Sequence, residues 1–285
     1  MQFMPDNESQ KHGAARDLPI GIFDSGIGGL TVVREIRKLL PGEDIVYLGD
    51  TARCPYGPRP LEQVRRFALA IARHLKEYNI KALVIACNTA SAAALADVAA
   101  ELPELPVLGV IEPGARAAVK KTRAGKVGII GTVGTINSGS YQQALARLAP
   151  DVGVQAVATP EFVEFVERGE VTGPRIRALA ARYVLPLRDW GMDTLILGCT
   201  HYPLLVNTLR AVLGPDVTLV SSAEETAADL ARVLEERDLR RKRHDGGILR
   251  VLATDESPLF LKLGRRFLDH DIEEVEFVDI GIEEA

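Results

Sequence analysis

The sequence predicts an α/β fold of two similar three-layer domains, with mainly parallel sheets and the active site in the cleft between them. Short continuous apolar runs alternate with amphipathic stretches, which is typical of parallel strands covered by helices on both faces. The chain has 285 residues, enough for two domains of about 150 residues. Two stretches of the first half also recur in the second half, which indicates that the domains are alike.

The first half of the chain alternates strands and helices. A buried apolar run at 20–23 ends in a glycine-rich turn at 25–29. A helix over 30–40 follows, because its apolar residues recur at helical spacing, and Pro41-Gly42 ends it. The same reasoning predicts strands over 45–48, 82–86 and 107–111, and helices over 61–78 and 91–102.

The alternation starts again after Glu112-Pro113-Gly114, which is interpreted as a domain boundary. Strands are predicted over 126–130, 152–158, 194–197 and 217–220, with helices between them, and the last part has helices over 224–236 and 259–268 and strands over 248–253 and 275–278. Residues 1–17 are polar without an apolar pattern, so a flexible tail is expected there.

The internal repeat relates two pairs of strands. Residues 21–25 resemble 128–132, an offset of 107, and residues 83–89 resemble 195–201, an offset of 112. If the two halves face each other, equivalent strands end across a cleft, and ligands of such sheets bind beyond the carboxyl ends of the strands. Cys87 and Cys199 both stand at those ends.

Composition excludes several classes of protein. The net charge is −5, and acidic residues flank the basic run at 240–243, so this run is interpreted as a solvated loop and no nucleic-acid partner is expected. No apolar run approaches the roughly 18–20 residues of a membrane span. The first 17 residues have no secretion signal, and three cysteines are too few for a disulfide framework, so a reducing cytoplasm is expected.

The two cysteines at the strand ends are candidates for acid/base chemistry. Each precedes a helix start, where unpaired N–H groups and the helix dipole favour a thiolate. Two facing thiols could remove a proton from one face of a carbon and return one to the other, which inverts a stereocentre without a redox cofactor. A redox pair is the rival use, but its sulfurs would leave no room for a substrate. Simple packing in the core is the other alternative.

Further polar residues fall at equivalent positions. The turn after Asp24 and Ser25 has Thr31 where the dinucleotide fingerprint needs glycine, and it lacks the lysine of a P-loop, so we expect it to hold a small anion. Other candidate contacts are Tyr56, Gly57, Thr132, Thr135 and Ser138, and His201 is a candidate proton partner of the neighbouring thiol. The histidines form no ligand cluster with the cysteines, so no metal is expected.

Several of these segments together resemble the glutamate racemase family, within the aspartate/glutamate racemase superfamily. The resemblance runs from about Pro19 to the end of the chain, and the matching segments are 22–31, 47–53, 55–57, 86–90 and 197–204. It implies a cofactor-independent interconversion of L- and D-glutamate that supplies D-glutamate for peptidoglycan, with no partner other than this substrate and a second copy in a homodimer. It also implies that residues 18–110 and 223–285 form one domain and residues 111–222 the other.

The resemblance also implies roles for individual residues. Cys87 acts on D-glutamate and Cys199 on L-glutamate, assisted by Asp24, His201 and one acidic residue in the stretch 160–167. Glu167 matches the position of this acid best, with Glu161 and Glu164 as alternatives. The implied substrate contacts are Asp24, Ser25, Tyr56, Gly57, Asn88, Thr89, Thr200 and His201, whereas Cys54 has no implied role.

Three other functions remain open on the sequence. A related racemase acting on aspartate would share the cysteine pair and differ in the pocket. A non-catalytic binder of amino acids could have the same two lobes, but it would not need titrating sulfurs. A thiol nucleophile that forms an acyl-enzyme needs one Cys–His pair and would leave Cys87 idle.

Overall fold

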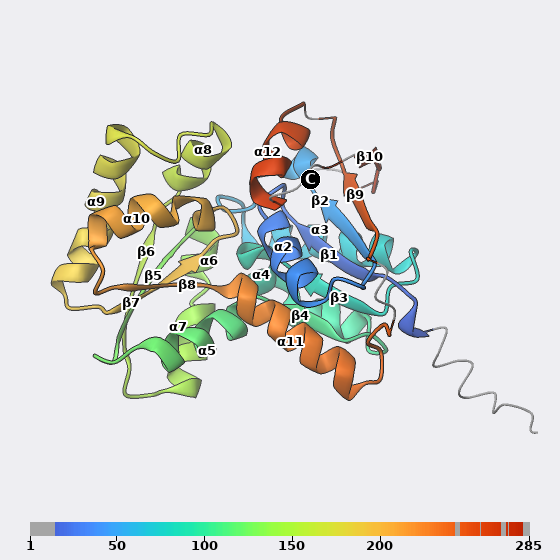
Figure 1. Cartoon of the computed structure of the whole chain (residues 1–285), viewed down its shortest axis with the longest axis horizontal. Coiled ribbons are helices and arrows are strands. Elements are labelled where there is room, and N and C mark those ends of the chain that lie inside the picture. The colour runs from blue at the N-terminus through green and yellow to red at the C-terminus, as the bar shows by residue number, and fades with distance from the viewer. Residues whose placement is uncertain (1–14, 243–245, 257, 269–271, 273, 282–285) are drawn as a thin grey trace, which may run out of the picture.

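The computed structural model describes residues 15–242, 246–256, 258–268, 272 and 274–281. It consists of two α/β lobes that lie side by side (Figure 1). The predicted flexible tail lies mostly outside the described residues. Its last part contacts the fold, since the carbonyl oxygen of Arg16 accepts a hydrogen bond from the Lys81 amine at 2.6 Å.

The first lobe contains a sheet with the strand order β10-β9-β2-β1-β3-β4, in which every pair is parallel. Its strands are β1 (Ile20–Asp24), β2 (Ile45–Gly49), β3 (Ala82–Ile85), β4 (Val107–Gly109), β9 (Leu249–Ala253) and β10 (Glu276–Phe277). The three central strands β1, β2 and β3 are buried along their whole length, which explains their uninterrupted apolar sequences.

Helices cover both faces of this sheet. Buried residues of α3 (Leu61–Lys76) and α4 (Asn88–Glu101) pack in one cluster with Phe23 and Leu83. Buried residues of α2 (Leu30–Leu39) and α12 (Pro258–Leu268) pack in another cluster with Ile22 and Val84. Successive strand residues point to opposite faces, so the two clusters lie on opposite sides of the sheet. A short 3-10 helix, η1 (Thr51–Arg53), follows β2.

The second lobe repeats this topology on a smaller scale. Its parallel sheet has the order β6-β5-β7-β8, which corresponds to β2-β1-β3-β4, so the repeat predicted from the sequence is confirmed. Its strands are β5 (Lys126–Gly131), β6 (Gly153–Ala158), β7 (Thr194–Gly198) and β8 (Thr218–Ser221). Its helices are α6 (Val133–Asn137), α7 (Ser140–Leu148), α8 (Glu161–Glu167), α9 (Pro174–Asp189), η2 (Tyr202–Leu205) and α10 (Val206–Leu213).

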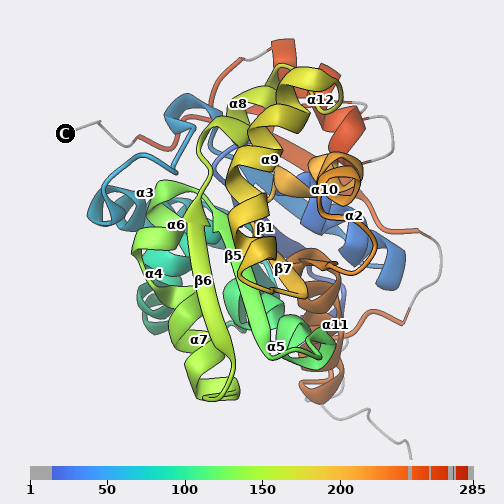
Figure 2. The same cartoon turned by 90° about the vertical axis from the view of Figure 1, so that its left-hand side faces the viewer.

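Two helices carry the chain between the lobes. Helix α5 (Ile111–Lys121) leads from β4 to β5, and α11 (Ser222–Glu236) leads from β8 back to β9 (Figure 1). The two helices lie next to each other (Figure 2). The predicted boundary Glu112-Pro113-Gly114 thus lies in the first turn of a helix rather than in a linker. Helix α11 packs against both α2 and α5, so the crossings contact both lobes.

Some predicted limits differ from the structure. The helix predicted over 91–102 begins at Asn88, because the Cys87 sulfur caps it by accepting the N–H of Ala90 at 3.5 Å. The strand predicted over 107–111 ends at Gly109. In the basic run, Arg241 pairs with Asp44 at 2.6 Å and with Asp17 at 3.3 Å, whereas Arg243 lies outside the described residues.

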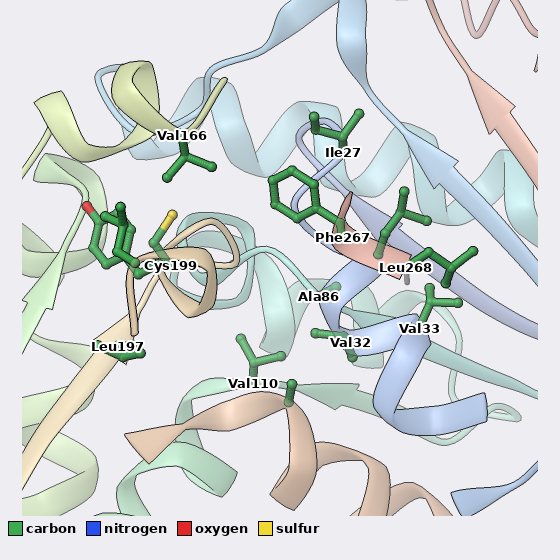
Figure 3. Close-up of a cluster of buried hydrophobic side chains, with 14 of the residues drawn as sticks. Ile27, Val32, Val33, Ala86, Val110, Val166, Leu197, Cys199, Phe267 and Leu268 are labelled. Carbon is green, nitrogen blue, oxygen red and sulfur yellow. The ribbon is translucent and has the colours of Figure 1, made fainter. Parts of the chain in front are cut away.

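One apolar cluster continues across both lobes. It includes Val32 and Phe267 of the first lobe and Val166 and Leu197 of the second (Figure 3). Cys199 belongs to the same cluster and is 7% exposed. The lobes therefore share part of their core around one of the two candidate thiols.

Candidate active site

A cavity of about 370 Å³ lies between the lobes at the carboxyl ends of the central strands. Both lobes line it, and both predicted acid/base cysteines reach it. The predicted site residues on its wall are Ser25, Tyr56, Gly57, Cys87, Asn88, Thr89, Thr132, Glu167, Cys199, Thr200 and His201. Asp24 and Thr135 lie behind this wall, fully buried, and Ser138 is not part of the lining.

Cys87 follows β3 and forms the N-cap of α4. Burial of its thiol, together with the negative charge of Asp24, raises the pKa of Cys87 to about 12, although the N–H of Ala90 and the side chain of Ser25 act in the opposite direction. The Cys87 thiol is therefore protonated at neutral pH.

Cys199 follows β7 at the equivalent position and lies beside His201. The distance from its sulfur to Nδ1 of His201 is 3.9 Å. Nε2 of His201 lies 3.3 Å from Oε1 of Glu167, close enough for an ion pair but not aligned for a hydrogen bond. Burial alone would lower the pKa of His201, but Cys199 and Glu167 outweigh it and raise the pKa to about 10. An imidazolium thus lies beside the second thiol.

The three acidic residues proposed from the sequence differ in their contacts with the cavity and with His201. Glu161 is held outside the cavity by hydrogen bonds from Tyr183 and Arg182. Glu164 lines the cavity but pairs with Arg168 at 3.4 Å. Glu167 alone among the three contacts His201, so the geometry favours it over the two alternatives.

Asp24 lies behind the cavity wall and contacts residues on either side of the cleft. Its Oδ1 accepts a hydrogen bond from the Thr200 hydroxyl at 3.3 Å, and its Oδ2 accepts the N–H of Gly26 at 3.1 Å. Burial raises the pKa of Asp24, whereas the charge of His201 and the N–H donors lower it. The Thr200 hydroxyl therefore binds Asp24, and no side-chain hydrogen bond caps the 3-10 helix η2 that follows.

A cluster of hydroxyls lies where α4 meets the second lobe. The Thr89 hydroxyl is 2.9 Å from that of Thr132 and 3.2 Å from that of Thr135, and the Thr132 side chain also caps α6. Next to them the carbonyl of Gly57 accepts the N–H of Gly134 at 2.8 Å. These contacts join the lobes and present hydroxyl donors that suit a carboxylate.

The sequence did not predict the apolar part of the cavity wall. Pro55, Pro58, Val133, Pro160 and Val163 line the cavity, and so does Cys54, to which no role was assigned. The Cys54 sulfur lies 4.0 Å from Oε1 of Glu167, and burial followed by that negative charge raises its pKa. Such apolar residues cannot be recognised as site residues from the sequence, because the same residue types occur at any helix start or turn.

No metal site accompanies these residues: within the described part of the chain, no group of three or more His, Cys, Asp or Glu side chains could hold a metal ion. No described helix is long and apolar enough to cross a membrane.

Comparison with known families agrees with this architecture. A family model described as Asp/Glu/Hydantoin racemase matches residues 20–230, so the chain is a racemase, an enzyme of the isomerase class. The chain belongs to the Asp/Glu/Hydantoin racemase family. The resemblance, the fold class and the enzyme class predicted from the sequence are thereby confirmed.

Within this family the chain is similar to proteins named glutamate racemase. The relative from Beutenbergia cavernae is 51% identical over 270 residues, 91% of this chain and 92% of the relative. The relative from Mycobacterium ulcerans is 53% identical over 88% of this chain and 92% of its own length. Among solved structures, glutamate racemase from Bacillus anthracis superposes with a TM-score of 0.89 at 45% identity, covering 94% of this chain and all of the other. The enzyme from Francisella tularensis, solved with D-glutamate, has a TM-score of 0.88 at 34% identity, covering 93% and 99%.

Proposed function

We propose that this protein interconverts L- and D-glutamate by moving the α-proton between Cys87 and Cys199 without a cofactor. The observation that carries the proposal is the placement of one thiol from each lobe on the wall of one cavity, at equivalent strand ends. Relatives about 50% identical over most of the chain are named glutamate racemase, which supports the substrate. In this proposal Cys87 acts on D-glutamate and Cys199 on L-glutamate.

The electrostatics support opposite starting states for the two sides. Cys87 is protonated, because its pKa lies near 12. On the other side His201 can exchange a proton with Cys199, 3.9 Å away, while Glu167 stabilises the imidazolium. When Cys199 removes the α-proton of L-glutamate, Cys87 delivers one to the opposite face, and the reverse reaction starts from the other protonation state.

The wall of the cavity supports recognition of a dicarboxylate amino acid. Four side chains that can donate hydrogen bonds line the same cavity as the two thiols: Ser25, Asn88, Thr89 and Thr132. Donors fixed around a carboxylate stabilise the charge that develops when the neighbouring carbon loses its proton. The apolar prolines and valines of the wall help to exclude water from it.

The test is racemisation of L-glutamate in D2O without added cofactor, followed by circular dichroism and by NMR of the α-proton. We expect the D-glutamate formed early to carry deuterium while the remaining L-glutamate carries little, because each face has its own acid/base group. Activity on aspartate alone would keep the mechanism and change the substrate. Absence of exchange with either amino acid would contradict the proposal.

Single-cysteine variants test the two thiols. Cys87→Ala and Cys199→Ala should each lower the rate of racemisation by roughly 10²–10⁴-fold or more, the loss typical of a missing acid/base group. The temperature of thermal unfolding should stay unchanged. Cys54→Ala is the matched control, because it removes a thiol from the same wall that is not at a strand end; it should retain turnover within about threefold of the wild type. Near-normal turnover of Cys87→Ala or Cys199→Ala would overturn the two-thiol mechanism.

We further propose that the reaction takes place in the cytoplasm, where thiols stay reduced, and that its D-glutamate is used for peptidoglycan. The homodimer implied by the resemblance stays a prediction, which light scattering of the purified protein checks.

A further inference from the structure

We propose that Tyr141 is a positioning residue that fixes the Asn88 side chain, so that the amide NH₂ group of Asn88 donates to the substrate carboxylate beside the reacting carbon. The inference rests on the proposed function and adds a residue of the second lobe that lies outside the cavity wall.

The contact joins the two lobes in the interior. Tyr141 lies on α7 and has no solvent exposure. Its hydroxyl donates to Oδ1 of Asn88, on α4 of the first lobe, at 2.7 Å. Asn88 itself lines the cavity. Because its oxygen is engaged by the phenol, its NH₂ group is the part left for a ligand, and an NH₂ group matches a carboxylate.

The direction of this hydrogen bond follows from the surroundings of the phenol. Burial raises the pKa of Tyr141, so the phenol keeps its proton, while the hydrogen bond with the Ser222 side chain acts in the opposite direction. Because an amide oxygen can only accept, the protonated phenol is the donor to Oδ1 of Asn88. This contact orients the amide without a charged group.

Both helices that connect the lobes, α5 and α11, have a residue close to the Tyr141 hydroxyl. Ser222 is the first residue of α11. Gly114 lies in the first turn of α5, and a Cβ there would be 3.2 Å from the Tyr141 oxygen and 3.2 Å from Cβ of Ser222. A side chain at position 114 would crowd the phenol, so the glycine gives it room. The orientation of Asn88 is therefore set where the lobes are joined.

The position of Asn88 in the chain indicates which carboxylate it binds. Asn88 directly follows Cys87, and the reacting carbon lies between the two thiols, so the α-carboxylate is the group within its reach. Negative charge grows on that carboxylate as the α-proton leaves. A hydrogen bond to this carboxylate becomes stronger in the transition state, so the loss of its donor lowers kcat more than it raises KM.

A double-mutant cycle tests whether Tyr141 acts through Asn88. Tyr141→Phe should lower kcat for glutamate by about tenfold or more with a smaller change in KM. In the Asn88→Ala background the same substitution should change kcat less than about twofold, because the group it positions is gone. Tyr202→Phe is the matched control: it removes an equally buried hydroxyl, which donates to the carbonyl of Thr159 outside the cavity wall, and should leave kcat unchanged.

Equal effects of Tyr141→Phe in the two backgrounds would overturn the inference, and so would a loss of kcat matched by Tyr202→Phe. The cycle is also measured by calorimetry of glutamate binding, so an inactive wild type that binds glutamate contradicts the proposed function but still tests Tyr141. A wild type that neither binds nor turns over glutamate contradicts both. If Tyr141→Phe does not fold, Gly114→Ala, whose Cβ would lie 3.2 Å from the Tyr141 oxygen and crowd the phenol, takes its place in the cycle with the same two outcomes.

Discussion

The charge of the His201 side chain depends on two neighbours that come from different elements. Cys199 precedes it on the turn after β7, and Glu167 reaches it from the end of α8. With the imidazole almost fully buried, the charge persists only because both partners oppose the cost of removing it from water. A carboxylate from another segment, Glu167, thus stabilises the protonated His201 imidazole beside the Cys199 thiol.

Replacing Glu167 by Gln should therefore change the pH dependence of catalysis. Without the carboxylate the pKa of His201 falls from about 10 toward its ordinary value, by roughly one to three units. The alkaline limb of kcat/KM should move to lower pH by a similar amount, since kcat/KM reports groups of the free enzyme. Glu164→Gln, on the same helix and without a contact to His201, is the control; an equal shift in both variants would argue against the assignment of Glu167.

The same substitution has a consequence for stability. The pKa of His201 is about 10 in the folded protein against an ordinary 6.5, so the folded state binds the proton more tightly. This contribution is complete below about pH 6.5 and is lost as the pH rises through about 10. We expect the wild-type Tm to fall between pH 7 and pH 10 more steeply than that of Glu167→Gln; parallel Tm profiles would contradict the raised pKa.

At the scale of elements, the turn between β1 and α2 brings the first lobe against Cys199 and its neighbours. The Thr31 hydroxyl donates to the carbonyl of Thr200 at 3.2 Å. A Cβ at Gly28 would overlap the Thr200 hydroxyl and lie 2.6 Å from Nδ1 of His201. The glycine is thus needed for the close approach of this turn to the second lobe.

Gly28→Ala should separate these two turns. The added methyl displaces Thr200 and His201, and a shift of about 1 Å in a catalytic group can cost about 10²-fold in rate. We expect kcat/KM to fall by about that factor, with a loss of about 1–3 kcal/mol in the free energy of unfolding from overpacking. Gly26→Ala is the control in the same turn, because its Cβ would meet Cys54 at 3.1 Å and nothing of the second lobe. Equal losses in both variants would mean that the turn, and not the approach to the second lobe, is what matters.

The strands and the strand-end residues are predictable from the sequence because their signals are local. Apolar runs predicted β1, β3, β5 and β7, and the polar residues that follow β3 and β7 indicated that Cys87 and Cys199 belong to a site. The start of α5 was not predictable, because proline is tolerated in a first turn and Pro113 reads equally well as a linker. The contact of Tyr141 with Asn88 was not predictable either, since it depends on how α7 packs against the other lobe.

At the scale of the whole molecule, the lobes are joined by more than their two crossing helices. One apolar cluster runs through both of them, and Phe267 of α12 contacts the His201 ring edge-on, with centroids 5.4 Å apart. Two domains that share a core lose buried apolar surface together, so neither is stable after the other has unfolded. Motions that admit the substrate are consequently expected to be small changes at the cleft rather than unfolding of one lobe.

This shared core predicts a single cooperative unfolding transition. The only tryptophan, Trp190, lies in the second lobe and reports its unfolding by fluorescence, while hydrogen exchange of β1 amides reports the first lobe. In urea the two probes should give the same midpoint. Phe267→Ala should lower the free energy of unfolding by about 3–5 kcal/mol, as for a buried phenylalanine, and shift both urea midpoints down together. Phe277→Ala, at a side chain 48% exposed, should change them little. Different urea midpoints for Trp190 and for β1 would show that the lobes unfold independently. A shift of the Trp190 midpoint alone in Phe267→Ala would show that the cluster between the lobes does not couple them.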